Sequence, residues 1–157
     1  MTIREVMNAE NIDFTGVESS YFLLGLLSAF DNRFQAMADK TIPDISWKQF
    51  FAIICINLCK ENPTIKELAE ILGSSHQNVK QILLKLKNKG FITIYVDEKD
   101  KRKQRILLTE KTRAFCEEHD QGSKSIVKKI FEGIDEKDFG TVINTLLQLE
   151  KYLEEVN

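Results

Sequence analysis

Two short segments of this chain carry side chains whose types suit contact with a polyanion. The first offers hydroxyl, imidazole, amide and ammonium groups on Ser74, Ser75, His76, Gln77, Asn78, Lys80 and Gln81. The second reads DEKDKRKQRILLTEK over residues 97–111 and offers Lys99, Lys101 and Arg102. Amide side chains can bind an adenine edge through two hydrogen bonds, and hydroxyl, backbone N–H and cationic groups hold phosphate. These ten residues are therefore the predicted DNA contacts.

Charge is distributed unevenly along the sequence. The segment from Lys80 to Arg105 contains nine lysines and arginines and three acidic residues, although the 157-residue chain has a net charge of -2. The segment from Glu132 to Glu155 contains seven acidic residues and two lysines. This asymmetry predicts that a polyanion docks on the first of these segments. The competing interpretation is an exposed helix and hairpin that simply carry many lysines.

The elements that would position these side chains can be predicted from local signals. Two capping boxes, Ser46–Gln49 and Thr64–Glu67, open helices at residues 47 and 65. Ser74 and Ser75 offer N-caps for a helix over residues 76–89, which Gly90 ends.

The sequence pattern changes from helical to strand-like after Gly90. Residues 91–96 are rich in β-branched and aromatic side chains, as residues 105–109 are less strongly, so a hairpin is expected. Two helices joined by a tight turn and followed by a hairpin make a winged helix-turn-helix. Its second helix enters the major groove and its hairpin reaches toward the minor groove. The predicted fold is mainly α with a small β-hairpin wing, and its core spans residues 46–109.

The segment LAEILGSSHQNVKQILLKLKNKGFI with the charged loop after it resembles the multiple antibiotic resistance regulator (MarR) family. That family's wing has the form Asp-x-Arg-Asp-x-Arg before Leu-Thr-Glu. Here the wing reads Asp97-Glu98-Lys99-Asp100-Lys101-Arg102, and Leu108-Thr109-Glu110 follows. Lys99 stands where the family has its wing-tip arginine, and lysine, a hydrated point charge, reads a narrow groove less well.

The resemblance covers nearly the whole chain and implies a single MarR-like domain over residues 1–157. Long helices at residues 17–40, 110–134 and 136–156 lie where the family has its dimerisation helices, so residues 1–40 and 110–157 are assigned to a two-fold dimer. Val142, Ile143, Leu146, Leu147, Leu149, Tyr152 and Leu153 give the last helix more apolar surface than one packed stripe needs. Two recognition helices would then face successive major grooves of a pseudo-palindromic operator in double-stranded DNA.

The resemblance also implies a small aromatic or anionic effector that releases the protein from DNA. Residues that could line its pocket are Phe30, Trp47, Phe50, Phe51 and Ile54. At helical spacing the same residues also suit an ordinary core.

Cys55, Cys59 and Cys116 are interpreted as structural thiols. Cys55 and Cys59 are four residues apart on one helix, where the Cβ atoms lie about 5–6 Å apart, and a disulfide needs about 3.5–4.5 Å. The alternative is a regulator that senses oxidants through these thiols.

Other function classes are disfavoured. The first residues mix charges among apolar side chains, unlike a secretory signal, and no apolar stretch is long enough to span a membrane, so a cytoplasmic location is expected. No glycine-rich phosphate loop, metal motif or nucleophile beside a histidine is present, so neither an enzyme, a metal nor a cofactor is expected. The leading prediction is a homodimeric DNA-binding transcriptional regulator that acts as a repressor. A winged-helix module that binds acidic proteins is the alternative from another class.

Overall fold

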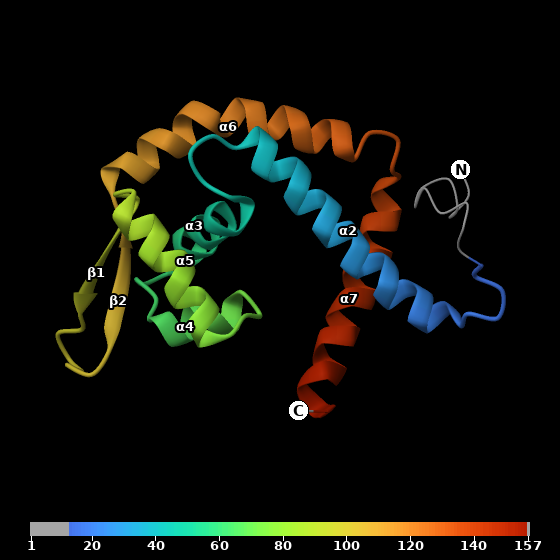
Figure 1. Ribbon diagram of the computed structural model, residues 1–157, viewed down its shortest axis with the longest axis horizontal. Coiled ribbons are helices and arrows are strands. Elements are labelled where there is room, and N and C mark those ends of the chain that lie inside the picture. Colours follow the sequence, from blue (N-terminus) through green and yellow to red (C-terminus); the bar gives the residue numbers. More distant parts are fainter. Residues whose placement is uncertain (1–12, 157) are drawn as a thin grey trace. The chain divides into compact units, whose positions relative to one another are not determined.

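The computed structural model describes residues 13–156 (Figure 1). The helices are α2 (Ser19–Thr41), α3 (Trp47–Leu58), α4 (Ile65–Ile71), α5 (His76–Asn88), α6 (Glu110–Ile130) and α7 (Glu136–Val156). Strands β1 (Ile92–Val96) and β2 (Gln104–Leu108) pair as an antiparallel hairpin between α5 and α6. The predicted fold class, mainly α with a β-hairpin wing, is confirmed. No helix among the described residues has the length and apolar character that a membrane crossing requires.

The chain divides into two compact units between Thr109 and Glu110. The first contains α2 and the segment from α3 to β2, which is called the winged domain below. The second contains α6 and α7. Residues 1–12, which begin the predicted N-terminal dimerisation segment, lie outside the described residues.

The core of the winged domain is made where α3, α4, α5 and the hairpin meet. Its fully buried side chains include Ile53, Leu68, Val79, Leu83, Leu86, Phe91, Ile92 and Ile106. Three of these, Val79, Leu83 and Leu86, form an inward stripe along α5 with the half-buried Ile82. Because this stripe is anchored in the core, the opposite side of α5 faces outward.

The predicted helix starts are confirmed by their hydrogen bonds. The Gln49 N–H donates to Ser46 Oγ at 3.3 Å and the Glu67 N–H donates to Thr64 Oγ1 at 3.2 Å, with the reciprocal bonds also present. The Asn78 N–H donates to Ser75 Oγ at 3.2 Å, which makes Ser75 the N-cap of α5. Gly90 follows α5 with a φ of 78°, a left-handed conformation that glycine adopts without strain.

The hairpin has one inward and one outward face. Ile92 pairs with Leu108 and Ile94 pairs with Ile106, and these pairs lie on the core side. The outward face carries Tyr95 opposite Arg105. The other edge of β2 bonds to the segment before α4, because the Ile106 N–H donates to the Pro63 carbonyl at 2.9 Å.

The second unit differs from the sequence prediction at the end of α6. This helix runs through Gly122 without a break. The same helix was expected to continue to Ile134 and instead ends at Ile130, because the chain turns at Gly133, where φ is 84°. None of the side chains described in α7 is buried, and Leu147 is 62% exposed.

Candidate nucleic-acid interface

The outward side of α5 carries the polar side chains predicted to contact DNA. His76, Gln77, Asn78, Lys80 and Gln81 are all exposed and belong to its first two turns. Ser75 is exposed immediately before the helix, and Ser74 is half-buried. Since Ser75 Oγ already accepts a hydrogen bond from the Asn78 N–H, this hydroxyl stabilises the helix start whatever else it contacts.

The loop that joins the two strands, residues 97–103, is organised around Asp97. Its Oδ1 atom accepts hydrogen bonds from the backbone N–H groups of Lys99 and Asp100, both at 2.8 Å. Its Oδ2 atom pairs with Nε of Arg105. The Arg105 hydrogen bond, with the N–H groups of Asp100 and Lys99, lowers the pKa of Asp97 to about 2. Asp97 therefore stays ionised at neutral pH and holds the loop in one conformation.

Arg105 connects the wing to the helix-turn-helix. Its Nη1 donates to the Asn62 carbonyl oxygen at 2.6 Å, and Asn62 Nδ2 donates to Tyr95 Oη at 3.0 Å. The Arg105 side chain is only 23% exposed. The sequence counts this arginine in the charge of the basic segment, and the structure shows that its guanidinium is bonded inside the domain.

Lys89 makes a similar internal connection. Its Nζ donates to the carbonyl oxygen of Asp44, in the loop between α2 and α3. Asp44 has a φ of 64°, the left-handed region that aspartate tolerates better than most residues. Two of the nine cations in the basic segment thus make internal contacts that join distant parts of the chain.

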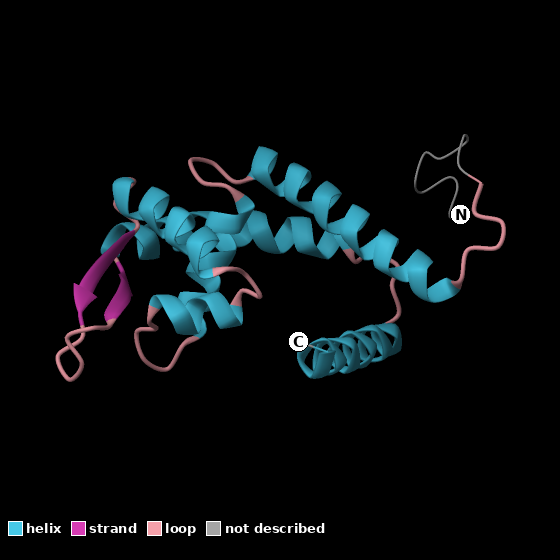
Figure 2. Cartoon of the chain, turned by 60° about the horizontal axis from the view of Figure 1, so that its bottom comes forward, coloured by secondary structure: helices cyan, strands magenta, loops and turns pink. Residues whose placement is uncertain are grey.

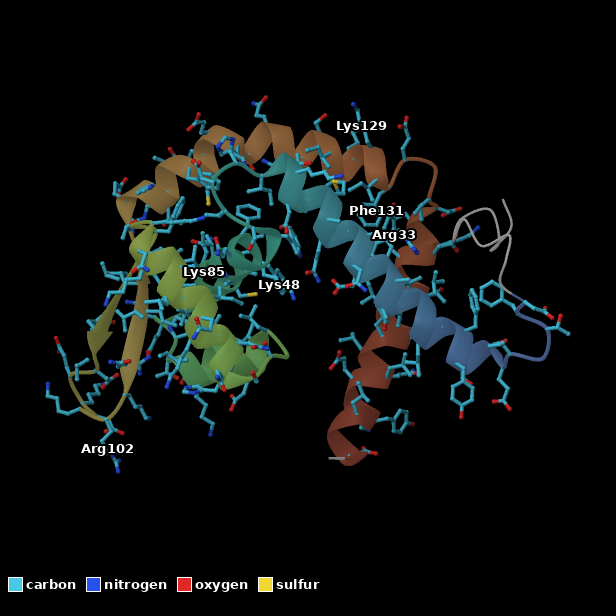
Figure 3. The ribbon with its side chains drawn as sticks, in the orientation of Figure 1. Arg33, Lys48, Lys85, Arg102, Lys129 and Phe131 are labelled. Carbon is cyan, nitrogen blue, oxygen red and sulfur yellow. The ribbon has the colours of Figure 1, made fainter. Side chains whose placement is uncertain are left out.

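The other cations of the wing are exposed at its tip. Lys99, Lys101, Arg102 and Lys103 all lie between the two strands. The Arg102 side chain is 91% exposed and its Nε lies 3.1 Å from Asp100 Oδ1, a pair that water and salt screen. Figure 3 shows Arg102 at the end of the hairpin, pointing away from the helices. The predicted wing contacts are therefore accessible.

The wing tip and the start of α5 share one side of the winged domain. In Figure 1 the hairpin loop and the α4–α5 segment both lie at the lower end of this domain. Figure 2 shows the hairpin projecting beyond the neighbouring helices. A shallow hollow beside the start of α5 is lined by Lys66, Ala69, Glu70, Gly73, Ser74 and His76. One straight polymer could therefore meet the helix and the hairpin together.

Comparison with protein families identifies this part of the chain. Residues 45–103 match the MarR family model. The winged helix-turn-helix of this chain is thus similar to that of the MarR family. The match spans α3, α4, α5 and the hairpin through the cations of its tip. It therefore includes all ten residues predicted to contact DNA.

Solved structures share the fold of this chain. A MarR/EmrR family transcriptional regulator from Acinetobacter sp. ADP1 is 17% identical with a TM-score of 0.78, covering 88% of this chain and 99% of that one. The S. aureus MepR–DNA complex is 20% identical with a TM-score of 0.73, covering 86% and 98%. Bordetella bronchiseptica BpsR, whose DNA binding is regulated by 6-hydroxynicotinic acid, is 21% identical with a TM-score of 0.69, covering 82% and 98%. No curated protein matches the sequence.

The aromatic residues predicted to line an effector pocket form a cluster between α2 and α3. Trp47 stacks on Phe51 with ring centroids 5.8 Å apart and lies 6.2 Å from Phe50. Phe34, which sequence reasoning missed, meets Trp47 edge to face at 4.7 Å and stacks with Phe30 at 6.2 Å. Phe34 lies four residues after Phe30 and thus on the same side of the helix, which is the sequence signal that could have assigned it to this cluster. Ile54 lies on α3 and is half-buried, as Trp47 is, whereas Phe30 is 55% exposed.

The three thiols are unpaired with one another and differ in surroundings. Cys59 Sγ donates to the Cys55 carbonyl oxygen at 3.2 Å. Burial raises the pKa of the Cys55 thiol, and the neighbouring Cys59 adds to the effect. Burial also raises the pKa of Cys116. No group of three or more potential metal ligands was found in the described part of the chain.

Proposed function

We propose that this protein is a homodimeric transcriptional regulator that binds double-stranded DNA, acting as a repressor. One observation carries the proposal: the start of α5, where the amide side chains are exposed, and the cationic wing tip lie at the same end of the winged domain. Amides suit base edges, and exposed lysines and arginines suit phosphate. The similarity to MepR, solved in complex with DNA, and to BpsR, whose DNA binding is regulated, supports this assignment.

The dimer is proposed from the exposed apolar side chains of α7. Val142, Ile143, Leu147, Tyr152 and Leu153 are all more than half exposed along this helix. Covering them with a second copy would remove a large apolar area from water, which favours association. We expect a particle of twice the 18.1 kDa chain mass in light scattering, and Leu147→Glu should shift it toward the monomer. A wild-type monomer at micromolar concentration would contradict the dimer.

The proposed binding mode places α5 in the major groove and the wing along the backbone toward the minor groove. Ser74, Ser75, His76, Gln77, Asn78, Lys80 and Gln81 contact DNA from the helix, and Lys99, Lys101 and Arg102 contact it from the wing. In a dimer the two helices would be about 34–36 Å apart, one turn of DNA, and would require a pseudo-palindromic operator.

Selection from a random duplex library, followed by fluorescence anisotropy on the enriched sequence, tests this function. We expect enrichment of a pseudo-palindrome that binds at least a thousandfold more tightly than unrelated DNA. Gln77→Ala and Gln81→Ala should lower the ratio of the affinity for the enriched sequence to that for unrelated DNA. Lys80→Gln should instead weaken binding to every sequence. Lys128→Gln on α6 removes the same charge outside the winged domain and serves as the matched control. Absence of any enriched sequence would overturn the proposal and favour a protein-binding module.

Release by an effector is proposed at the aromatic cluster of Phe30, Trp47, Phe50, Phe51 and Ile54. Trp47 is the only tryptophan in the sequence, so its fluorescence reports on this cluster without interference. An aromatic acid is the class of ligand that such a cluster suits. Titration with 6-hydroxynicotinic acid, the regulator of BpsR, is the first probe. A change in Trp47 emission together with loss of DNA binding supports release, and unchanged emission would exclude this compound as the ligand.

A further inference from the structure

α5 exposes a leucine in the middle of its polar surface. Leu84 is 50% exposed although the residues around it on this side of the helix are amides and lysines. An isolated exposed leucine is common on protein surfaces. This one is notable for its place, because the proposed DNA-binding function brings this side of α5 against base edges.

The position of Leu84 follows from helix geometry. Successive residues of an α-helix are rotated by about 100°, so steps of three and four residues stay on one side. Val79, Leu83 and Leu86 define the inward side of α5. Opposite them, one outward row contains Gln77, Gln81, Leu84 and Asn88, and all four are exposed.

Lysines flank this outward row on both sides. By the same rotation Lys80 and Lys87 lie along one flank and Lys85 lies along the other, and all three are exposed. The major groove has the corresponding arrangement, with base edges on its floor and a phosphate backbone along each rim. The row runs from Gln77 to Asn88, eleven residue steps or about 16 Å at 1.5 Å per step, and thus about five base pairs.

The chemistry of the row selects a sequence class. Glutamine and asparagine amides bond to adenine in the major groove, and an apolar side chain contacts the thymine methyl, which is the principal apolar group that the groove displays. We propose that Leu84 is a specificity-determining residue that contacts a thymine C5-methyl group, within an A·T-rich half-site read by the outward row of α5. This inference rests on the proposed function and names the DNA sequences that the site recognises.

Deoxyuridine tests the contact because it differs from thymidine only by the missing methyl group. In the selected operator, each thymine is replaced in turn by uracil, symmetrically in both half-sites, and binding is measured by anisotropy. We expect one pair of replacements to weaken wild-type binding about fifteenfold, since a buried methyl contributes about 0.8 kcal/mol and the dimer makes the contact twice. The other pairs should change affinity little.

Leu84→Ala should lose this sensitivity to uracil at that position and should retain the wild-type melting temperature, because the side chain is exposed. Leu58→Ala removes an exposed leucine at the end of α3 and should keep the full sensitivity. A wild-type protein indifferent to uracil at every position, or a sensitivity that persists in Leu84→Ala, would overturn the assignment while leaving DNA binding intact. Failure to select any operator would instead refute the proposed function and this inference with it.

Discussion

Replacing two lysines of the wing loop should change how DNA binding depends on salt. Lys99 and Lys101 are both exposed, and the hydrogen bond that fixes the loop at Lys99 uses its backbone N–H and not its ammonium group. The Lys99→Gln/Lys101→Gln variant therefore removes charge while leaving the loop bonded to Asp97. If the wing tip grips phosphate, this variant releases fewer counterions when it binds.

The size of the effect follows from the number of lost contacts. Two lysines in each of two subunits make four phosphate contacts at most, and each contributes about 0.9 to the slope of log K against log salt concentration. The slope of the variant should then be shallower by up to about 3.6. Between 50 and 200 mM salt the wild type should lose up to about 150-fold more affinity than the variant.

Fluorescence anisotropy on the selected operator at five or six salt concentrations measures both slopes. Lys128→Gln/Lys129→Gln, on α6, removes the same two charges outside the winged domain and should leave the slope unchanged. Identical slopes for the wild type and the wing variant would refute the contact between wing and phosphate, however well the protein binds. A shallower slope in the α6 control would show instead that net charge alone governs binding.

Three further results are expected. The pKa of Asp97 falls from 3.8 in the unfolded chain to about 2 in the folded protein, so the ionised carboxylate stabilises the fold. This contribution is complete above about pH 4 and is lost as the pH falls toward 2. The difference in melting temperature between the wild type and Asp97→Asn should therefore shrink over that range and stay constant at higher pH. Ser75→Ala should cost about 1 kcal/mol of stability and Ser75→Asp should restore it, as urea denaturation would show, since this residue caps α5. The raised pKa values of Cys55 and Cys116 should make both thiols react slowly with a thiol reagent at pH 7 and leave DNA binding unchanged in peroxide; loss of binding in peroxide that Cys116→Ser prevents would instead establish redox sensing.

The elements that the sequence predicted well depend on interactions between near neighbours. The capping boxes join residues three apart, so Ser46 with Gln49 and Thr64 with Glu67 were visible without any knowledge of the fold. The inward stripe of α5 needs only the helical period. The strands followed from a change in that period after Gly90. The ends of α6 were less predictable, because the apolar residues beyond Ile130 continue a helical pattern that the turn at Gly133 interrupts.

The contacts that the sequence could not predict join residues far apart in the chain. Arg105 bonds to the carbonyl of Asn62, 43 residues earlier, and Lys89 bonds to that of Asp44, 45 residues earlier. A backbone carbonyl has no signature in the sequence, so nothing distinguished these two cations from ones without such a contact. Counting charges therefore located the basic segment but could not show that Arg105 is bonded within the domain and only 23% exposed.

These internal cations have a consequence for recognition. Arg105 pairs with Asp97 at the base of the loop and bonds to Asn62 just before α4, so one side chain ties the wing to the helix-turn-helix. Tyr95 adds a second tie through Asn62. A wing held in this way loses little conformational freedom when it meets DNA, and the entropic cost of binding falls accordingly. Arg105 thus contributes to affinity by fixing the loop that carries Lys99, Lys101 and Arg102, although its own guanidinium is bonded to Asp97 and Asn62.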